Sequence, residues 1–119
     1  MISNQILQST IDGLKGITRI ELCICDTEGR ELVSTSQQMD VVPAQVTSFV
    51  DSAADSQQLS GCQFFKIYDE HKLEYILLAK GSSDDVYMVG KIAAFQIQNL
   101  IVAYKERFDK DNFIKNLLL

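Results

Sequence analysis

Three cysteines and a single histidine are the residues whose chemistry could define a site in this chain. Cys23 and Cys25 are two positions apart in an alternating apolar segment, so both point to the same face of a strand. With Cys62 they could form a metal or redox site, but structural zinc requires four ligands and His71 lies in a predicted turn. The alternative is that the three thiols are small buried apolar side chains, as unpaired cysteines commonly are. We expect no metal site.

Catalytic motifs are missing from the sequence. His71 belongs to the tetrapeptide Asp69–Lys72, which reads as a hairpin tip, and no nucleophile can be placed beside it. The serines lack any motif that activates a hydroxyl. Gly81 precedes the start of a predicted helix but stands alone, so it does not form a phosphate-binding loop. We therefore predict that the chain is not an enzyme and carries no cofactor.

Polar residues in apolar surroundings offer a different kind of site. Arg19, Lys66 and Tyr75 lie in segments that we expect to form the centre of the sheet. If a pocket lies between the sheet and its helices, these residues are candidates to line it, and their chemistry suits a small carboxylate metabolite. The alternative is an ordinary dimer interface or exposed strand faces. The amides of Gln96, Gln98 and Asn99 lie within the most hydrophobic part of a long helix and, if buried, need hydrogen-bond partners.

Charge and composition exclude several other classes of function. The net charge is −5 and the pI about 4.7, which argues against nucleic-acid binding by this segment, because such binding needs clustered lysine and arginine. No apolar run of membrane-spanning length and no signal peptide is present, so we expect no membrane partner. The odd number of cysteines suits a reducing compartment. We therefore expect a cytoplasmic protein.

Hydrophobic periodicity predicts a mixed order of elements. Gly16 is expected to end the first helix, and Gly29 to supply the positive φ of the first hairpin turn. Polar loops are expected at residues 35–41 and 55–61. The predicted elements are a helix at 4–15, strands at 17–25 and 30–34, a helix at 42–54, strands at 62–68 and 73–79, and a long helix at 83–119.

The long helix is apolar nearly all round between residues 86 and 104. A helix that is apolar on two sides is buried on two sides, so we expect one side to meet its own sheet and the other a second subunit. We predict a homodimer in which Ile97, Ile101, Tyr104 and Phe108 belong to the dimer and signalling helix, with Ile97 and Ile101 in the interface or directly beneath it. Residues 1–104 then form the sensor and dimerisation domain, and residues 105–119 begin a connector to downstream domains.

The order of elements predicts an α+β fold, in which helices flank a small antiparallel sheet and a long helix follows at the C-terminal end. A further short strand is expected in the sheet, but its position is not evident from the sequence. Sensor domains of the PAS and GAF kind have this architecture, and so do roadblock-type dimerisation domains.

A family resemblance adds to this interpretation. Residues 77–99 contain an apolar strand, Gly81, an acidic capped turn and the start of the long helix. They resemble the end of the N-terminal domain of sugar-diacid and purine-catabolism type transcriptional regulators. Residues 105–119 are similar to the helix that leads, in that family, towards a DNA-binding domain. The resemblance is strongest over residues 75–119.

The resemblance implies the N-terminal ligand-sensing and dimerisation module of a cytoplasmic transcriptional regulator. Its C-terminal helix would pass the signal to a DNA-binding domain that these residues do not include. The alternative is a roadblock-like protein–protein scaffold domain without a small-molecule ligand. A cavity lined by polar groups would favour the sensor, whereas a filled core and a sheet shared by two subunits would favour the scaffold.

Overall fold

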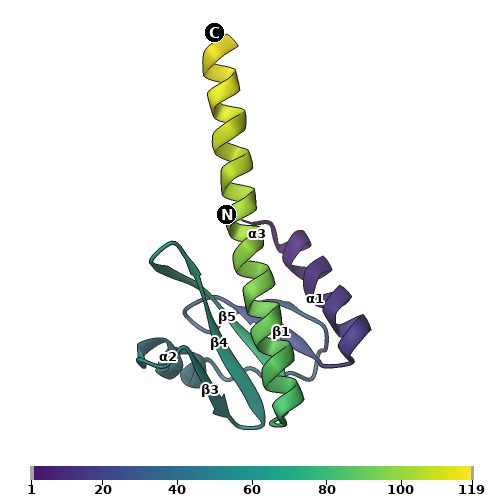
Figure 1. Ribbon diagram of the computed structural model, residues 1–119. Helices are drawn as coiled ribbons and strands as arrows, with labels where there is room; N and C mark the ends of the chain where they lie inside the picture. Colours follow the sequence, from purple (N-terminus) through teal and green to yellow (C-terminus); the bar gives the residue numbers. More distant parts are fainter. Residues whose placement is uncertain (1, 119) are drawn as a thin grey trace.

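The computed structural model describes the backbone of residues 2–118 and the side chains of residues 2–106. Within these residues the chain forms three helices and five strands, and the last helix extends well past the rest of the domain (Figure 1). The elements are α1 (Asn4–Thr18), β1 (Leu22–Cys25), β2 (Glu31–Ser34), α2 (Pro43–Asp51), β3 (Ser56–Leu59), β4 (Cys62–Asp69), β5 (Lys72–Lys80) and α3 (Asp84–Leu118).

The five strands form one antiparallel sheet in the order β2-β1-β5-β4-β3. The central strand β5 pairs with β1, where Ile24 lies opposite Leu77, and with β4, where Phe65 also lies opposite Leu77. Helices α1 and α3 pack against one face of this sheet and α2 against the other (Figure 1). The α+β fold with a long C-terminal helix, predicted from the sequence, is confirmed.

Each face of the sheet has its own hydrophobic core. The face under α1 and α3 buries Leu7 and Ile11 of α1 with Phe65 and Leu77 of the sheet. The face under α2 buries a smaller cluster in which the rings of Phe49 and Phe64 meet edge to face, with centroids 5.7 Å apart. Because both faces of β5 are covered, its central residues can be apolar in succession, as the sequence predicted.

Helix α1 begins as expected but ends later. The Ser3 hydroxyl accepts a hydrogen bond from the Ile6 N–H at 3.3 Å and caps the helix. Gly16 does not end it, because the helix continues to Thr18 and closes at Arg19, whose φ of 63° is left-handed. The backbone N–H of Arg19 bonds to the Lys15 carbonyl, as at a helix C-terminus. The prediction that Arg19 lies on a strand is therefore wrong.

The missing strand is β3, which lies in the segment predicted to be a polar loop. Its sequence Ser-Gln-Gln-Leu carries no hydrophobic alternation, so periodicity could not reveal it. Pairing with β4 produces it, through the tight turn at Ser60 and Gly61, both of which have positive φ. The loop prediction for residues 55–61 is thus wrong, and the expectation of a fifth strand is correct.

Over residues 84–106, whose side chains the structure describes, helix α3 is buried on one side only. Val86, Ala93, Ile97 and Ile101 face the sheet and are buried. Its segment Asp84–Glu106 is long and apolar enough to span a membrane by composition, but these residues pack it against the sheet. The side chains of Gln96, Gln98 and Asn99, which would have needed hydrogen-bond partners if buried, are all exposed.

Candidate interaction surfaces

Strand β3 forms an open edge of the sheet. It pairs with β4 on one side and ends the strand order on the other. The Lys66 N–H donates to the Asp55 carbonyl at 3.1 Å, so these two residues form a hydrogen-bonded pair. Because such pairs alternate along an antiparallel ladder, the backbone groups of Ser56 and Gln58 point away from β4. They are a row of donors and acceptors for another strand.

The two edges of the sheet differ in their protection. At the β2 edge, the side-chain amide of Gln8 in α1 donates to the Ser34 carbonyl at 2.9 Å. Natural proteins commonly block an edge with charges or proline, and the four residues of β3 include neither. Gln57 and Gln58 are exposed on it. The β3 edge is therefore short but available for pairing.

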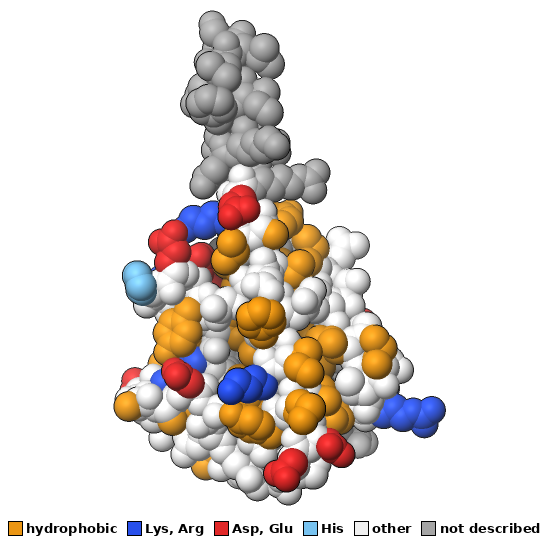
Figure 2. Space-filling model, viewed as in Figure 1, with side chains coloured by type: hydrophobic (Ala, Val, Ile, Leu, Met, Phe, Trp, Pro, Cys, Tyr) orange, Lys and Arg blue, Asp and Glu red, His pale blue; other side chains and the backbone are white. Residues whose placement is uncertain are grey.

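A second surface lies on α3, opposite its buried side. We call it the outer stripe and define it by four large apolar side chains that remain exposed in this chain: Met88 (61%), Ile92 (54%), Phe95 (67%) and Val102 (50%). At 3.6 residues per turn these positions share one face of the helix. Figure 2 shows hydrophobic side chains gathered on the face of the molecule that α3 crosses. Exposed apolar side chains that gather on one face are typical of an interaction site.

The three residues predicted to bind a carboxylate are not brought together. Arg19 is exposed at the end of α1, whereas the Tyr75 side chain is buried under α1 and α3. Lys66 reaches towards the opposite face, where its ammonium donates to the Ser52 carbonyl and lies 5.1 Å from the centroid of the Phe49 ring. Burial raises the pKa of Tyr75 above its usual value. A single ligand cannot touch all three side chains in this arrangement.

Lys66 also borders a pocket of about 420 Å³ between the β3 edge and α3. Neither Arg19 nor Tyr75 is among its lining residues. The pocket is lined by Asp55, Ser56, Phe65, Lys66, Tyr87, Lys91, Ala94, Phe95 and Gln98.

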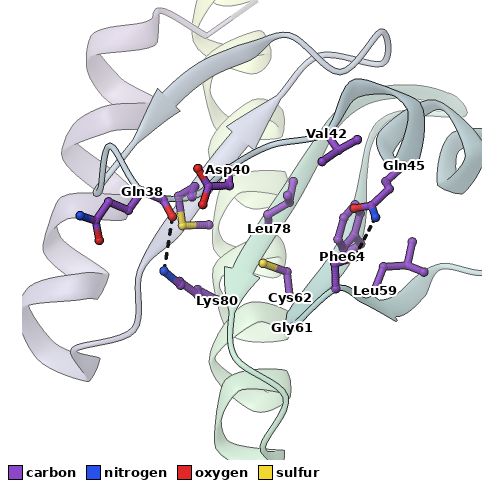
Figure 3. Close-up of a pocket in the computed structure, with 12 residues that line it drawn as sticks. Gln38, Asp40, Val42, Gln45, Leu59, Gly61, Cys62, Phe64, Leu78 and Lys80 are labelled. Atoms are coloured by element: carbon purple, nitrogen blue, oxygen red, sulfur yellow. Dashed lines mark hydrogen bonds between the residues drawn. The ribbon is translucent and has the colours of Figure 1, made fainter.

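A pocket of about 380 Å³ lies on the other face, where the start of α2 meets the β3–β4 turn (Figure 3). Leu59, Cys62, Phe64 and Leu78 give it an apolar lining. Two hydrogen bonds join polar groups of its lining. The Lys80 ammonium donates to the Gln38 carbonyl at 3.3 Å, and the Gln45 amide donates to the Ser60 hydroxyl at 2.7 Å.

The cysteines occupy the covered face beneath α2. The sulfurs of Cys23 and Cys25 lie 3.8 Å apart, and all three thiols are free and buried. The hydrogen bond with Cys25, together with burial, raises the pKa of Cys23 far above its usual value. Burial likewise raises the pKa of Cys62. Thiols of this kind are poor nucleophiles and poor metal ligands, which matches the structural role weighed from the sequence.

The residues predicted for the dimer and signalling helix are divided between core and surface. Ile97 is fully buried and Ile101 is 6% exposed, and both pack in the core under α3. Tyr104 is 42% exposed. The side chain of Phe108 lies outside the described residues. The apolar surface that α3 offers to a second molecule is thus the outer stripe. Ile97 does not belong to it, because Ile97 lies on the opposite side of the helix, against the sheet.

Comparisons with known proteins place the fold. No protein-family model and no curated protein matches the chain. Among solved structures, MglB of Myxococcus xanthus is similar, with a TM-score of 0.56 and 10% sequence identity, over 87% of this chain and 94% of that chain. The similarity shows that the chain has the roadblock-type arrangement, one of the three architectures that the order of elements predicted.

Proposed function

We propose that the chain is a protein–protein scaffold domain that dimerises through the β3 edge and does not depend on a small-molecule ligand. The observation that carries this proposal is the outward-facing backbone of Ser56 and Gln58 on an edge without charge or proline. Pairing of two β3 strands about a two-fold axis would join two five-stranded sheets into one of ten strands. The roadblock-type fold supports a scaffold over a sensor.

The proposed dimer is compatible with the layers of the protomer. A two-fold axis perpendicular to the sheet keeps α1 and α3 of both copies on one face and α2 of both on the other. Adding a strand across the edge satisfies the backbone groups that β3 leaves facing outward, which is the physical basis of recognition by strand addition. We propose that this dimer functions in the cytoplasm without catalysis.

The interpretation as a transcriptional regulator's sensor is a second candidate, and one observation favours it. The pocket of Figure 3 has an apolar lining and a rim of polar groups, within the size range of small-molecule sites. Against it, Asp40 and Lys80 both border the pocket, so it does not offer a purely cationic site for a carboxylate. Arg19 and Tyr75 are not among its lining residues.

Replacement of Gln58 by proline tests the proposed dimer. Proline removes the outward N–H of Gln58 and leaves the hydrogen bonds between β3 and β4 in place. We expect sedimentation to show a loss of β3-dependent association in Gln58→Pro, whereas Gln58→Ala, which keeps the N–H, behaves as wild type. Equal masses for wild type and Gln58→Pro under all conditions would contradict the proposal.

A further inference from the structure

The outer stripe follows the spacing of a coiled-coil seam. Its members lie four, three and seven positions apart, and the position that the spacing skips is Asn99, which is exposed. In a heptad labelled abcdefg, Ile92 and Asn99 then occupy position a, and Met88, Phe95 and Val102 occupy position d. An exposed seam with a β-branched residue and a single asparagine at its a positions is the pattern of a two-stranded parallel helix pair.

We propose that the outer stripe binds a second copy of this chain, with the two α3 helices parallel and in register. In this pair each residue of the seam faces its own counterpart, as a self-complementary interface about a two-fold axis requires. The two Asn99 amides would face each other and exchange a hydrogen bond. In an antiparallel pair, Asn99 would instead face an apolar d residue, and its amide would lose its partner in a desolvated seam.

The charges beside the seam permit this arrangement. Between Met88 and Val102, none of the residues at positions a and d is charged. In the parallel register, Lys91 of one copy lies beside Gln96 of the other, and Gln98 lies beside Ala103. Neither contact opposes like charges. A second copy is therefore accommodated without electrostatic cost along the stripe.

The length of the seam limits the strength of the association. The next a position after Asn99 is Glu106, where the carboxylates of two copies would meet, so close packing ends after Val102. The seam then spans 14 residue steps, or ~21 Å of helix. A seam of this length with four large apolar side chains is small for a stable interface, which buries ~800 Å² per partner. We expect association that depends on protein concentration and is weaker than an obligate dimer.

This surface is separate from the β3 edge. The outer stripe points away from the sheet, whereas β3 pairs within the plane of the sheet. The inference therefore stands whether or not the β3 dimer forms. If both surfaces are used, a protomer with two self-complementary interfaces assembles beyond two copies.

Sedimentation velocity of the full chain over a wide range of concentration distinguishes the two surfaces. We expect wild type to exceed the mass of two copies at high concentration. Gln58→Pro should keep a concentration-dependent dimer, Phe95→Glu should keep only the β3-dependent dimer, and the double variant should be a monomer. Circular dichroism checks that each variant is folded, and Phe95 is exposed, so its replacement should not unfold the domain.

Gln96→Glu is the matched control for charge. It adds the same charge one position away from Phe95, on the flank that would lie beside Lys91 of the second copy, so association should be retained. If Phe95→Glu has the same mass as its parent in both the wild-type and the Gln58→Pro background, the outer stripe does not self-associate and the proposal fails. That result would leave the β3 dimer untouched.

Cysteine cross-linking tests the parallel register. In Asn99→Cys two identical positions meet, so copper phenanthroline, as the oxidant, should take two electrons from the two thiols, release two protons and leave an intermolecular disulfide. The native cysteines are buried, which lowers the background. Thr47→Cys, on the surface of α2, is the control. Cross-linking no faster than this control, or cross-linking only between Met88→Cys and Asn99→Cys chains, would overturn the parallel pair.

Discussion

The ring of Phe65 lies directly against the backbone of Gly90. A Cβ added at Gly90 would lie 2.2 Å from Cε2 of this ring, closer than real Cβ contacts. The missing side chain at Gly90 is therefore what allows α3 to approach β4. Phe65 also contacts the Tyr87 ring, with centroids 5.6 Å apart, so it has little room to move aside.

Gly90→Ala should destabilise the domain even though alanine favours helices. The helix propensity gained is about 1 kcal/mol, whereas overpacking in a close contact costs about 1–3 kcal/mol. We expect a net loss in the free energy of unfolding, measured by urea denaturation. Gly13→Ala on α1 is the control, because nothing lies within 4 Å of its added Cβ, and it should stabilise. Equal gains for both variants would contradict the close packing.

Ile97 and Phe95 separate the core side of α3 from the outer stripe. Ile97→Ala removes a fully buried side chain and should cost about 2–5 kcal/mol in the free energy of unfolding. Phe95→Ala should change the stability of the dissociated chain by no more than about 0.5 kcal/mol, because the ring is 67% exposed. Denaturation at low protein concentration measures both. The reverse order would mean that the helix packs through its other face.

Glu21 gives the stability a dependence on acid pH. The Thr35 hydroxyl donates to its carboxylate and Lys15 lies 3.3 Å away, and both lower the pKa of Glu21, the Thr35 bond most. Because the pKa is lower in the folded state, the ionised carboxylate stabilises the fold at pH values above the unfolded pKa of ~4.3. This stabilisation is lost as the pH falls through the folded pKa. The half-exposed pair limits the effect to about 1 kcal/mol or less. Glu21→Gln should flatten this part of the stability curve, measured by thermal unfolding against pH.

Alkylation should report the burial of the cysteines. Because the pKa values of Cys23 and Cys62 are raised, little thiolate forms near neutral pH, and iodoacetamide should modify the native chain slowly. Mass spectrometry after labelling with and without urea measures the difference. Cys62, which is 8% exposed and lines the pocket of Figure 3, should react before Cys23 and Cys25. Rapid native labelling of Cys23 would show that its face of the sheet opens.

A thermal-shift screen separates the scaffold from the sensor. Small mono- and dicarboxylates, sugar acids and purine breakdown products should leave the melting temperature unchanged if the chain is a scaffold. A ligand that binds the native state would instead add ~2.7 kcal/mol at a hundredfold excess over its dissociation constant. Lys80→Ala and Lys66→Ala would then locate it in the pocket of Figure 3 or in the pocket beside β3. A shift that either variant abolishes would favour the sensor.

The sequence by itself determined the elements whose signals are local. Ser3 as a helix cap, Gly29 with a φ of 87°, and the apolar run of Ile76 to Leu78 in a strand covered on both faces are each dictated by neighbours along the chain. The long helix and the α+β fold class follow from the same periodicity. The shared face of Cys23 and Cys25 follows from the alternation of side chains along a strand.

Only the tertiary structure decided the rest, because it depends on contacts between distant segments. Strand β3 has no hydrophobic alternation and exists through its pairing with β4, and Arg19 ends α1 although Gly16 carries the stronger local signal. The apolar residues of α3 are alike in sequence, and only packing on the sheet separates buried Ile97 from exposed Phe95. The outer stripe became visible as a surface because one sheet can cover only one side of a helix.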